Sequence, residues 1–298
     1  MQKRGFICGA HRSGTTWLGK ILETCTDCSV LHEPFNYAYG VESVPCWYPD
    51  AKVHNAVLTG LLADIFAGRA RFKTQRDSDV KWKAVMRSIT GGPDNIHYRR
   101  KLRANPKTLI LKDPFVSRMA AMLCNQHDMY GVAMVRHPGA YLNALKRMGW
   151  GVPELGVDDC SLRQMRGDDA EEFAARVGRF WAQLNGDILD QVISSQGRIQ
   201  LLRHEDLCEN PLRESQKIIA HFGMQATAGT TSFLRQSTTG TTARARPGEL
   251  HQFVRKTRDI PHSWRSNLSD GEYGAIMAEC KEIYGRIYVS DDLMLASV

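Results

Sequence analysis

The segment RGFICGAHRSGTTWLGKIL, residues 4–22, joins a short apolar run to an amphipathic run through a polar turn flanked by Gly9 and Gly14. The apolar run at 6–8 predicts a buried strand, and the apolar spacing after Thr15 predicts a helix that begins there. Such a turn directs backbone N–H groups and the positive end of the helix dipole at one point. The segment therefore predicts a phosphate-binding loop.

This loop differs from the nucleoside-triphosphate loop at one position. The spacing of Gly9 and Gly14 matches G-x-x-x-x-G-K-[ST], but Thr15 occupies the position of the lysine. That lysine reaches the β- and γ-phosphates, so its absence disfavours ATP and GTP and favours a shorter phosphate group. Arg12 supplies positive charge inside the loop instead. An ordinary strand-turn-helix with a chance pair of glycines is the alternative.

The string RSGTTW that follows His11 resembles the 5′-phosphosulfate loop of the sulfotransferases that use 3′-phosphoadenosine 5′-phosphosulfate (PAPS), in which the first residue is Lys or Arg. In that family the loop holds the 5′-phosphosulfate of PAPS, and the tryptophan lies near the adenine. The resemblance implies that the cofactor-binding residues here include Arg12, Ser13, Gly14, Thr15, Thr16 and Trp17.

The composition fits a globular protein with an anionic ligand. The chain has 298 residues, of which 43% are apolar and 24% charged, enough for a sizeable core. It has no apolar run of about 18 residues and no signal peptide is recognisable, so we expect no membrane span and a cytoplasmic location. The net charge of +7 is too small and too dispersed to indicate nucleic acid.

The eight cysteines are scattered, as reduced core thiols are. Only Cys25 and Cys28 have the spacing of metal ligands, and no second pair accompanies them. We therefore expect no metal site.

A candidate catalytic base follows a short extended stretch at residues 29–31. Pro34 is expected to hold Glu33 in an extended conformation, at a strand end where an open α/β sheet binds ligands. In the tyrosylprotein-type branch of the family, a glutamate about this far beyond the loop arginine is the catalytic base, so the resemblance implies that role for Glu33. A solvated or salt-bridged Glu33 is the alternative, and the neighbouring His32 is the competing base.

A buried strand is predicted at residues 108–111, and it delivers Lys112-Asp113-Pro114 at its carboxyl end. The same branch of the family carries a Lys-Asp-Pro here, whose lysine stabilises the transferring sulfuryl group. The resemblance therefore implies this catalytic role for Lys112. A salt bridge to Asp113 or Glu33 is the alternative.

Another buried strand is predicted at residues 131–135, before Arg136-His137-Pro138 and a helix. This resembles the 3′-phosphate motif of the family, Arg-x-Pro with a serine eight residues after the arginine. Ala144 stands in the serine position, so Asn143 would have to replace the missing hydroxyl. In the alternative, Arg136 caps a helix or pairs with Asp113.

The C-terminal third predicts one long helix at residues 170–193 and a fourth buried strand at 199–202. The string HEDL at 204–207 is similar to a Tyr-Glu-Asp-Leu segment of the family, with carboxylates that we interpret as structural. A helix is predicted to follow and to end at Gly223.

Residues 229–261 predict a long basic loop. In the family, a lysine and a glycine ahead of a Trp-Lys pair close over the 3′-phosphate. Counting back from Trp264 places Arg258 and Asp259 at those positions, so the motif is degraded. The other basic residues of this stretch are Arg244, Arg246, Arg255 and Lys256. A solvated basic loop is the alternative.

The strand-helix units at 4, 108, 131 and 199 predict a single α/β domain over residues 1–298, with a central parallel sheet flanked by helices on both faces, of the P-loop type. An acceptor-side insertion or lid is expected around 36–106, with an aromatic segment at 36–50, a helix at 53–68 and a basic stretch at 69–87. The 3′-phosphate loop is expected around 229–265.

Together the motifs imply a PAPS-dependent sulfotransferase that moves a sulfuryl group to a hydroxyl of a carbohydrate, lipid or other small molecule by in-line displacement. Arg12 and Lys112 would stabilise charge on the leaving oxygen and the sulfuryl group, and Glu33 would take the acceptor proton. A P-loop small-molecule kinase and a catalytically inactive nucleotide-binding protein are the alternatives.

Overall fold

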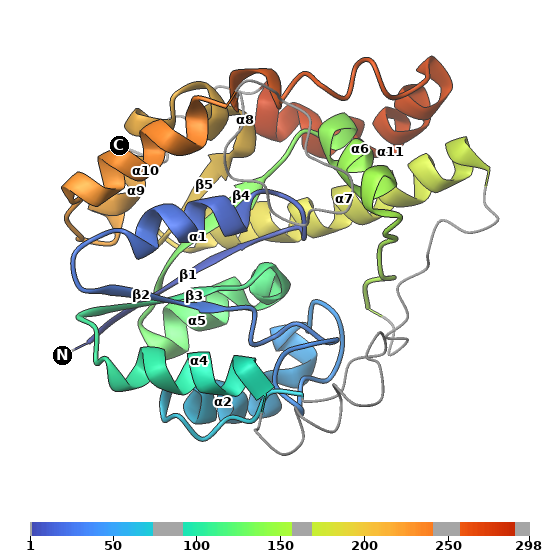
Figure 1. The fold of residues 1–298 in the computed structure, drawn as a ribbon. Helices are drawn as coiled ribbons and strands as arrows, with labels where there is room; N and C mark the ends of the chain where they lie inside the picture. Colours follow the sequence, from blue (N-terminus) through green and yellow to red (C-terminus); the bar gives the residue numbers. More distant parts are fainter. Residues whose placement is uncertain (1, 74–91, 157–168, 241–256, 290–298) are drawn as a thin grey trace.

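A parallel sheet forms the centre of the described chain (Figure 1). The computed structural model describes residues 2–73, 92–156, 169–240 and 257–289. Within these ranges the sheet has five strands in the order β2-β3-β1-β4-β5. They are β1 (Lys3–Gly9), β2 (Cys28–His32), β3 (Thr108–Lys112), β4 (Tyr130–Val135) and β5 (Ile199–Arg203). The predicted parallel sheet is confirmed.

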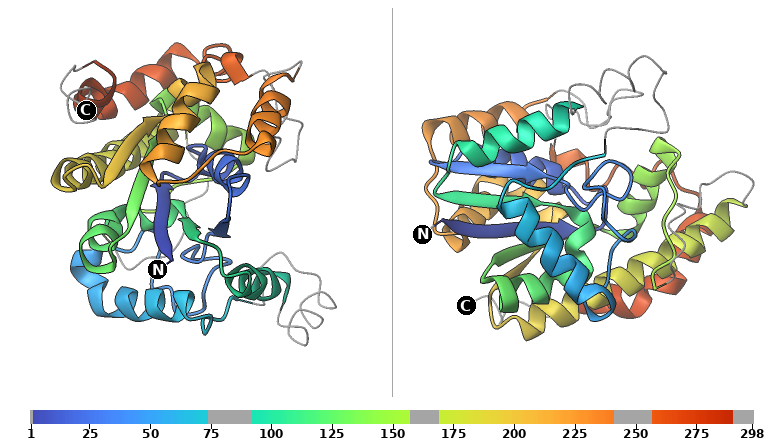
Figure 2. Two further views of the ribbon diagram at one scale, coloured as in Figure 1. Left: turned by 90° about the vertical axis from the view of Figure 1, so that its left-hand side faces the viewer. Right: turned by 90° about the horizontal axis from the view of Figure 1, so that it is seen from below.

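Helices cover both faces of this sheet (Figure 2). One core contains residues from α1 (Thr15–Glu23), α8 (His204–Glu209), α9 (Pro211–His221) and α10 (Ala228–Thr238). The other contains residues from α2 (Ala51–Phe66), the 3₁₀ helix η1 (Pro114–Met119), α5 (Ala120–His127), α6 (Pro138–Met148), α7 (Ala170–Ser194) and α11 (Asp270–Tyr288). Phe6 and Cys8 enter this second core and Ile7 the first, because successive strand side chains point to opposite faces.

The strand register brings the predicted motifs to one edge of the sheet. Lys112, the last residue of β3, pairs with Ile7 on one side and with His32 on the other. On the far side of β1, Val135 at the end of β4 pairs with Arg203 at the end of β5. All the strands are parallel, so the segments that follow their carboxyl ends meet at this edge.

Most predicted helices are found, with local signals at their ends. Helix α6 begins with Pro138, whose ring suits a first helical turn, and ends at Gly149 with a φ of +64°. The long helix α7 is confirmed. The helix predicted to end at Gly223 is divided at Asn210 into α8 and α9, because Pro211 cannot donate a backbone hydrogen bond to continue α8.

Two helices correct the sequence interpretation. Helix α10 lies inside the stretch predicted as a loop at 229–261, so that prediction is wrong for its first part. Thr and Ser dominate α10 and obscure its apolar spacing, but a capping box of Thr227 and Thr230 starts it, and Leu234 is buried. Helix α4 (Gly92–Arg103) was not predicted, because few of its residues are apolar. The four basic residues 244, 246, 255 and 256 lie outside the described residues.

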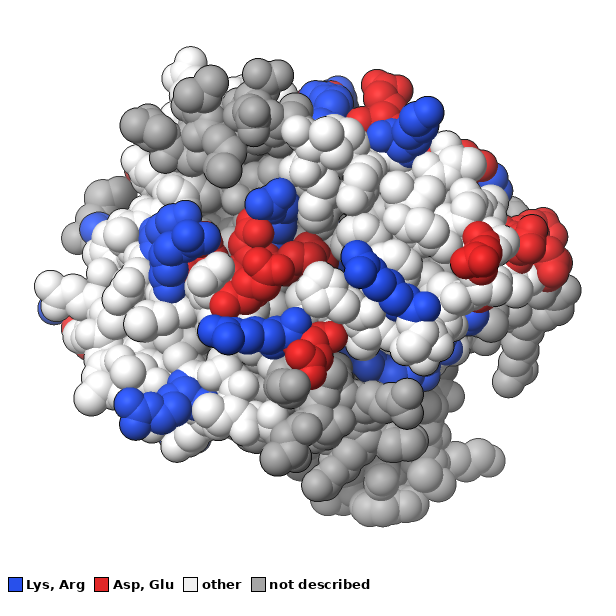
Figure 3. Space-filling view, turned by 90° about the horizontal axis from the view of Figure 1, so that it is seen from above, with Lys and Arg blue, Asp and Glu red and all other residues white. Residues whose placement is uncertain are grey.

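Charges on the described surface are mixed. On the face that Figure 3 shows, Lys and Arg side chains alternate with Asp and Glu side chains. The buried Glu214 of α9 pairs with the exposed Arg213 and Lys217. Among the described helices, none is long and apolar enough to cross a bilayer.

Candidate active site

The loop between β1 and α1 has the backbone of an anion cradle. Gly9 and Gly14 have φ values of +142° and +102°, and Arg12 also has a positive φ of +68°. A Cβ at Gly9 would lie 2.2 Å from Met134 O, and one at Gly14 would lie 2.5 Å from His204 Cδ2. Both positions therefore require glycine. Gly14 is the N-cap residue of α1 and no side chain caps this helix, which suits the N-terminus for an anionic group.

The loop side chains differ in how they are placed. Ser13 is fully buried, and its N–H donates to Ala10 O at 3.0 Å, so Ser13 shapes the turn. The Arg12 guanidinium carbon lies 5.5 Å from the centroid of a Trp150 ring. Trp17 is half-buried and its Nε1 donates to Ser237 Oγ of α10 at 3.3 Å. Helix α10, which sequence reasoning missed, thus packs beside the loop tryptophan.

Lys112 joins two of the predicted catalytic elements. Its side chain is only 1% exposed, and its Nζ lies 2.5 Å from Glu33 Oε1 and 3.2 Å from Thr16 Oγ1. It reaches them beside Gly19 of α1, where a Cβ would lie 3.0 Å from Lys112 Cγ. The ammonium therefore lies between the first turn of α1 and the carboxylate that follows β2. The salt bridge foreseen as an alternative for Lys112 is present.

Glu33 has a conformation that the sequence interpretation got wrong. It was expected to be extended because Pro34 follows it, but its φ is +50°. Its N–H donates to Lys112 O at 2.9 Å, and its carbonyl accepts from Asn36 N at 3.1 Å. The chain therefore turns sharply at the end of β2. In this turn the Glu33 carboxylate reaches the Lys112 ammonium, whereas the side chain of His32 is exposed.

The charges around Glu33 keep it ionised. Burial by itself would raise the pKa of this carboxyl, but Lys112, His32 and the hydrogen bond from Asn36 outweigh it and lower the pKa to about 2. Opposite charge and hydrogen bonding to the charged form both favour ionisation. Glu33 is thus a carboxylate over the whole physiological range of pH.

Asp113 has a structural role beside this pair. It is fully buried, and its two oxygens accept from Phe35 N at 2.5 Å and Phe115 N at 3.0 Å. Burial and the nearby Glu33 carboxylate raise its pKa to about 8. Asp113 thus ties the turn that contains Glu33 to the start of η1.

His11 is a site residue that sequence reasoning missed. The hydroxyl oxygen of Tyr48 lies 2.7 Å from both the backbone N and the Nδ1 of His11, and Tyr141 Oη lies 3.4 Å from its Nε2. Burial and the adjacent Arg12 lower the pKa of His11 to about 4, so the imidazole is neutral. The only sequence signal was the position of His11 inside the loop.

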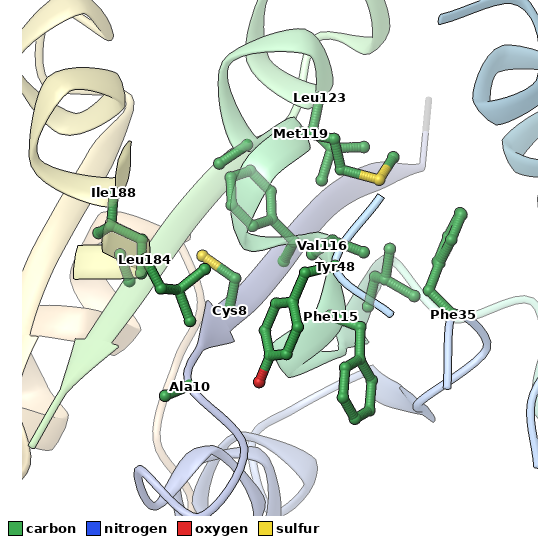
Figure 4. Close-up of a cluster of buried hydrophobic side chains, with 14 of the residues drawn as sticks. Cys8, Ala10, Phe35, Tyr48, Phe115, Val116, Met119, Leu123, Leu184 and Ile188 are labelled. Atoms are coloured by element: carbon green, nitrogen blue, oxygen red, sulfur yellow. The ribbon is translucent and has the colours of Figure 1, made fainter. Parts of the chain in front are cut away.

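The aromatic segment 36–50 contributes to the core as well as to the surface. Tyr48 is 1% exposed and lies beside Phe115, with its hydroxyl directed toward the chain near Ala10 (Figure 4). Tyr48 thus anchors this segment in the core. This segment therefore supports the phosphate loop directly.

Arg136 approaches the same loop from β4. Its Nη1 donates to Arg12 O at 2.9 Å, and its own carbonyl accepts from Trp181 Nε1 at 2.8 Å. The neighbouring His137 N–H donates to Glu205 Oε1 at 3.0 Å, and Tyr288 Oη donates to Glu205 Oε2 at 2.9 Å. The carboxylate of the HEDL string thus supports the start of α6.

The segment before α11 covers the start of α6. The Trp264 ring stacks on His137 with centroids 4.9 Å apart, and a Cβ at Gly139 would lie 2.8 Å from that indole ring. Asn143 lies half-buried on α6. Arg258 is exposed on the short helix η2 (Thr257–Asp259), which packs against α8. In the described ranges no hydrogen bond joins either residue to the loop.

The structure therefore gathers the loop, Glu33, Lys112 and Arg136 at one edge of the sheet. Within the described ranges, no group of three or more His, Cys, Asp or Glu residues could hold a metal ion.

A family model supports an assignment for this arrangement. The model described as "Sulfotransferase family" matches residues 6–228, about three quarters of the chain, from β1 to the start of α10. The chain belongs to the sulfotransferase family. It is therefore an enzyme of sulfuryl transfer. No curated protein sequence matches this sulfotransferase significantly.

Several solved structures resemble this sulfotransferase at low identity. The sulfotransferase domain of the Synechococcus PCC 7002 olefin synthase is 16% identical, with 93% of this chain and 94% of that chain covered and a TM-score of 0.46. The sulfotransferase domain of the curacin biosynthetic pathway is 13% identical, with 94% and 98% covered and a TM-score of 0.49. Mouse sulfotransferase SULT7A1, complexed with PAP, is 11% identical, with 99% and 88% covered and a TM-score of 0.44.

Proposed function

We propose that this sulfotransferase moves a sulfuryl group from PAPS to the hydroxyl of a small acceptor such as a carbohydrate or lipid. The observation that carries the proposal is the position of Lys112, whose ammonium joins the first turn of α1 to the Glu33 carboxylate. A cation that contacts both the anion cradle and a carboxylate suits a group transfer between a bound anion and a hydroxyl.

The cradle fits a phosphate group bound without a metal. Two required glycines, an uncapped helix N-terminus and Arg12 supply backbone donors and positive charge. Loop residues 13–16 would hold the 5′-phosphate, Trp17 would lie near the adenine, and Arg136 would hold the 3′-phosphate, with Asn143 and Arg258 as further contacts. PAPS supplies the activated sulfuryl group when it is bound.

The catalytic roles follow from charge and protonation. Arg12 and Lys112 would stabilise negative charge on the oxygen that leaves, which lowers the barrier of an in-line displacement. Glu33 would accept the proton of the acceptor hydroxyl. Its low pKa makes it a weak base, but in a loose transition state the hydroxyl becomes acidic only late, and a weak base suffices.

Calorimetric titration of PAP, ATP and AMP, each in EDTA and in Mg²⁺, tests the proposal. Because Thr15 replaces the lysine of triphosphate loops, PAP in EDTA should bind more tightly than ATP with Mg²⁺. A preference for ATP that depends on Mg²⁺ would overturn the proposal and favour a kinase. Tight PAP binding without transfer to any acceptor hydroxyl would favour an inactive nucleotide-binding protein.

A further inference from the structure

Asn36 makes a contact with Glu33 that the proposed mechanism does not use. The residue is 7% exposed, and its Nδ2 donates to Glu33 Oε2 at 2.9 Å. Its Oδ1 accepts from Ala38 N at 3.0 Å and Tyr39 N at 3.2 Å. Two backbone donors therefore occupy the amide oxygen, which leaves the amide nitrogen to face the carboxylate.

The backbone around Asn36 holds this amide in place. Asn36 N donates to Glu33 O, and Gly40 N donates to Asn36 O at 2.6 Å. A Cβ at Gly40 would lie 2.2 Å from Pro34 O, so the turn closes too tightly for any side chain there. The amide is thus presented to Glu33 by a rigid turn.

Asn36 and Lys112 together hold both oxygens of the Glu33 carboxylate. Lys112 contacts Oε1 and Asn36 contacts Oε2, so the carboxylate cannot rotate without breaking one of these contacts. Each carboxylate oxygen still has a second lone-pair direction that can accept a hydroxyl proton. Lys112 also contacts Thr16, whereas the described contacts of the Asn36 Nδ2 are with Glu33.

We propose that Asn36 is a positioning residue that holds the Glu33 carboxylate in the orientation in which it receives the acceptor proton. This inference rests on the proposed function, in which Glu33 is the base. It differs from a merely structural role, because the turn needs only the Oδ1 of Asn36 and the positioning role needs its Nδ2.

The effect of Asn36 on the titration of Glu33 must be separated from the effects of the titratable groups near Glu33. The titratable groups that interact with Glu33 electrostatically are Lys112, His32, Asp113, His11 and Tyr48. Substitution of Asn36 leaves all five unchanged. A change in the titration of Glu33 therefore reports the contact with the amide.

The substitution Asn36→Asp tests the proposal. The introduced carboxylate keeps an oxygen for the N–H groups of Ala38 and Tyr39 but replaces the Nδ2 donor by negative charge. The titration of Glu33 should then move upward by about two pH units, because like charges disfavour ionisation. NMR of ¹³Cδ-labelled glutamate between pH 7 and 3 follows the titration of Glu33, which should enter this range in the variant and lie below it in the wild-type protein, where the pKa is about 2. The Glu33 signal is identified by its absence in Glu33→Gln. The acid limb of kcat should move in the same direction.

The control is Ser43→Asp, which adds the same charge to an exposed position of the same segment. It should leave the Glu33 titration and kcat unchanged. If Asn36→Asp behaves like this control while Glu33→Gln is inactive, the role of Asn36 is overturned and the proposed function stands. If Glu33→Gln is active, the proposed role of Glu33 fails, and the role of Asn36 fails with it.

The second variant, Asn36→Ser, keeps a hydroxyl acceptor for the turn but is too short to reach Glu33. It should lower kcat about tenfold or more, as expected for a misplaced catalytic group, and keep PAP affinity within about twofold. A parallel loss of kcat, PAP affinity and thermal stability would show that Asn36 only holds the turn, and would overturn the proposal.

Discussion

Lys112 Nζ lies 2.5 Å from Glu33 Oε1. The two residues are far apart in sequence and lie at the ends of different strands, yet they form a buried ion pair at the sheet edge. The Lys112 side chain is 1% exposed and that of Glu33 is 21% exposed. Removal of one partner from such a pair leaves an uncompensated charge and is strongly destabilising. The ionisation of Glu33 and the stability of the fold therefore depend on the same contact.

We predict that Lys112→Met destabilises the protein by about 3 kcal/mol at pH 7 and by less at pH 4. In the wild-type protein the pKa of Glu33 is lowered from 4.5 to about 2, so its contribution to stability is present above pH 4.5 and is lost as the pH falls toward 2. When Lys112 is absent, burial raises the pKa of Glu33, and the ionised carboxylate destabilises the fold mainly at neutral pH. Thermal unfolding at the two pH values measures the difference.

The matched control for this prediction is Lys101→Met. Lys101 pairs with Glu23 at 2.6 Å, but both side chains are about 30% exposed. This variant should lose about 1 kcal/mol or less of the free energy of unfolding. Equal losses of stability in Lys112→Met and Lys101→Met at pH 7 would contradict the importance of the buried pair.

Glu33→Gln should retain PAP affinity and lose about 10²-fold or more in kcat, because it removes the proton acceptor and keeps the shape of the side chain. The acid limb of kcat should lie below about pH 5.5 with Glu33 as the base, whereas His32 would place it near about 6.5. The pH profile and His32→Ala check the assignment. An active Glu33→Gln beside an inactive His32→Ala would reverse it.

Tyr48→Phe should weaken PAP binding about tenfold, because loss of the hydroxyl leaves the backbone N–H and Nδ1 of His11 without their described partner inside the phosphate loop. The melting temperature should fall as well. Calorimetry of PAP binding and thermal unfolding measure both effects. Tyr141→Phe is the control, since its hydroxyl lies 3.4 Å from His11 Nε2 and should matter less. Equal effects in both variants would argue against a specific role for Tyr48.

Arg136→Ala should weaken PAP binding by about 1.5 to 3 kcal/mol, the range of a charge-assisted hydrogen bond, and should weaken AMP binding less. The structure adds a contact that the sequence did not predict, since Arg136 Nη1 donates to Arg12 O in the loop that both nucleotides would use. Calorimetry of PAP and AMP separates the two roles. Equal losses for both nucleotides would mean that Arg136 acts only through the loop.

Local sequence patterns were enough to predict the framework of the site. Apolar runs and the glycine pair predicted β1, the loop and α1, and the string that ends at Pro138 predicted that a helix, α6, follows. These features depend on residues close together in sequence, through strand and helix periodicity and the φ values that glycine allows. The common edge of the strands followed from parallel topology, so the approach of Lys112 and Glu33 to the loop could be expected.

The tertiary structure decided which atoms meet at that edge. The sequence predicted an extended Glu33, but its N–H bonds to Lys112 O and the chain turns with φ at +50°. His11 and Tyr48 are 37 residues apart, and nothing in their spacing predicts that one hydroxyl contacts two atoms of the histidine. Periodicity determines which face of an element is apolar, whereas a hydrogen bond between distant residues depends on the packing of all the elements that carry them.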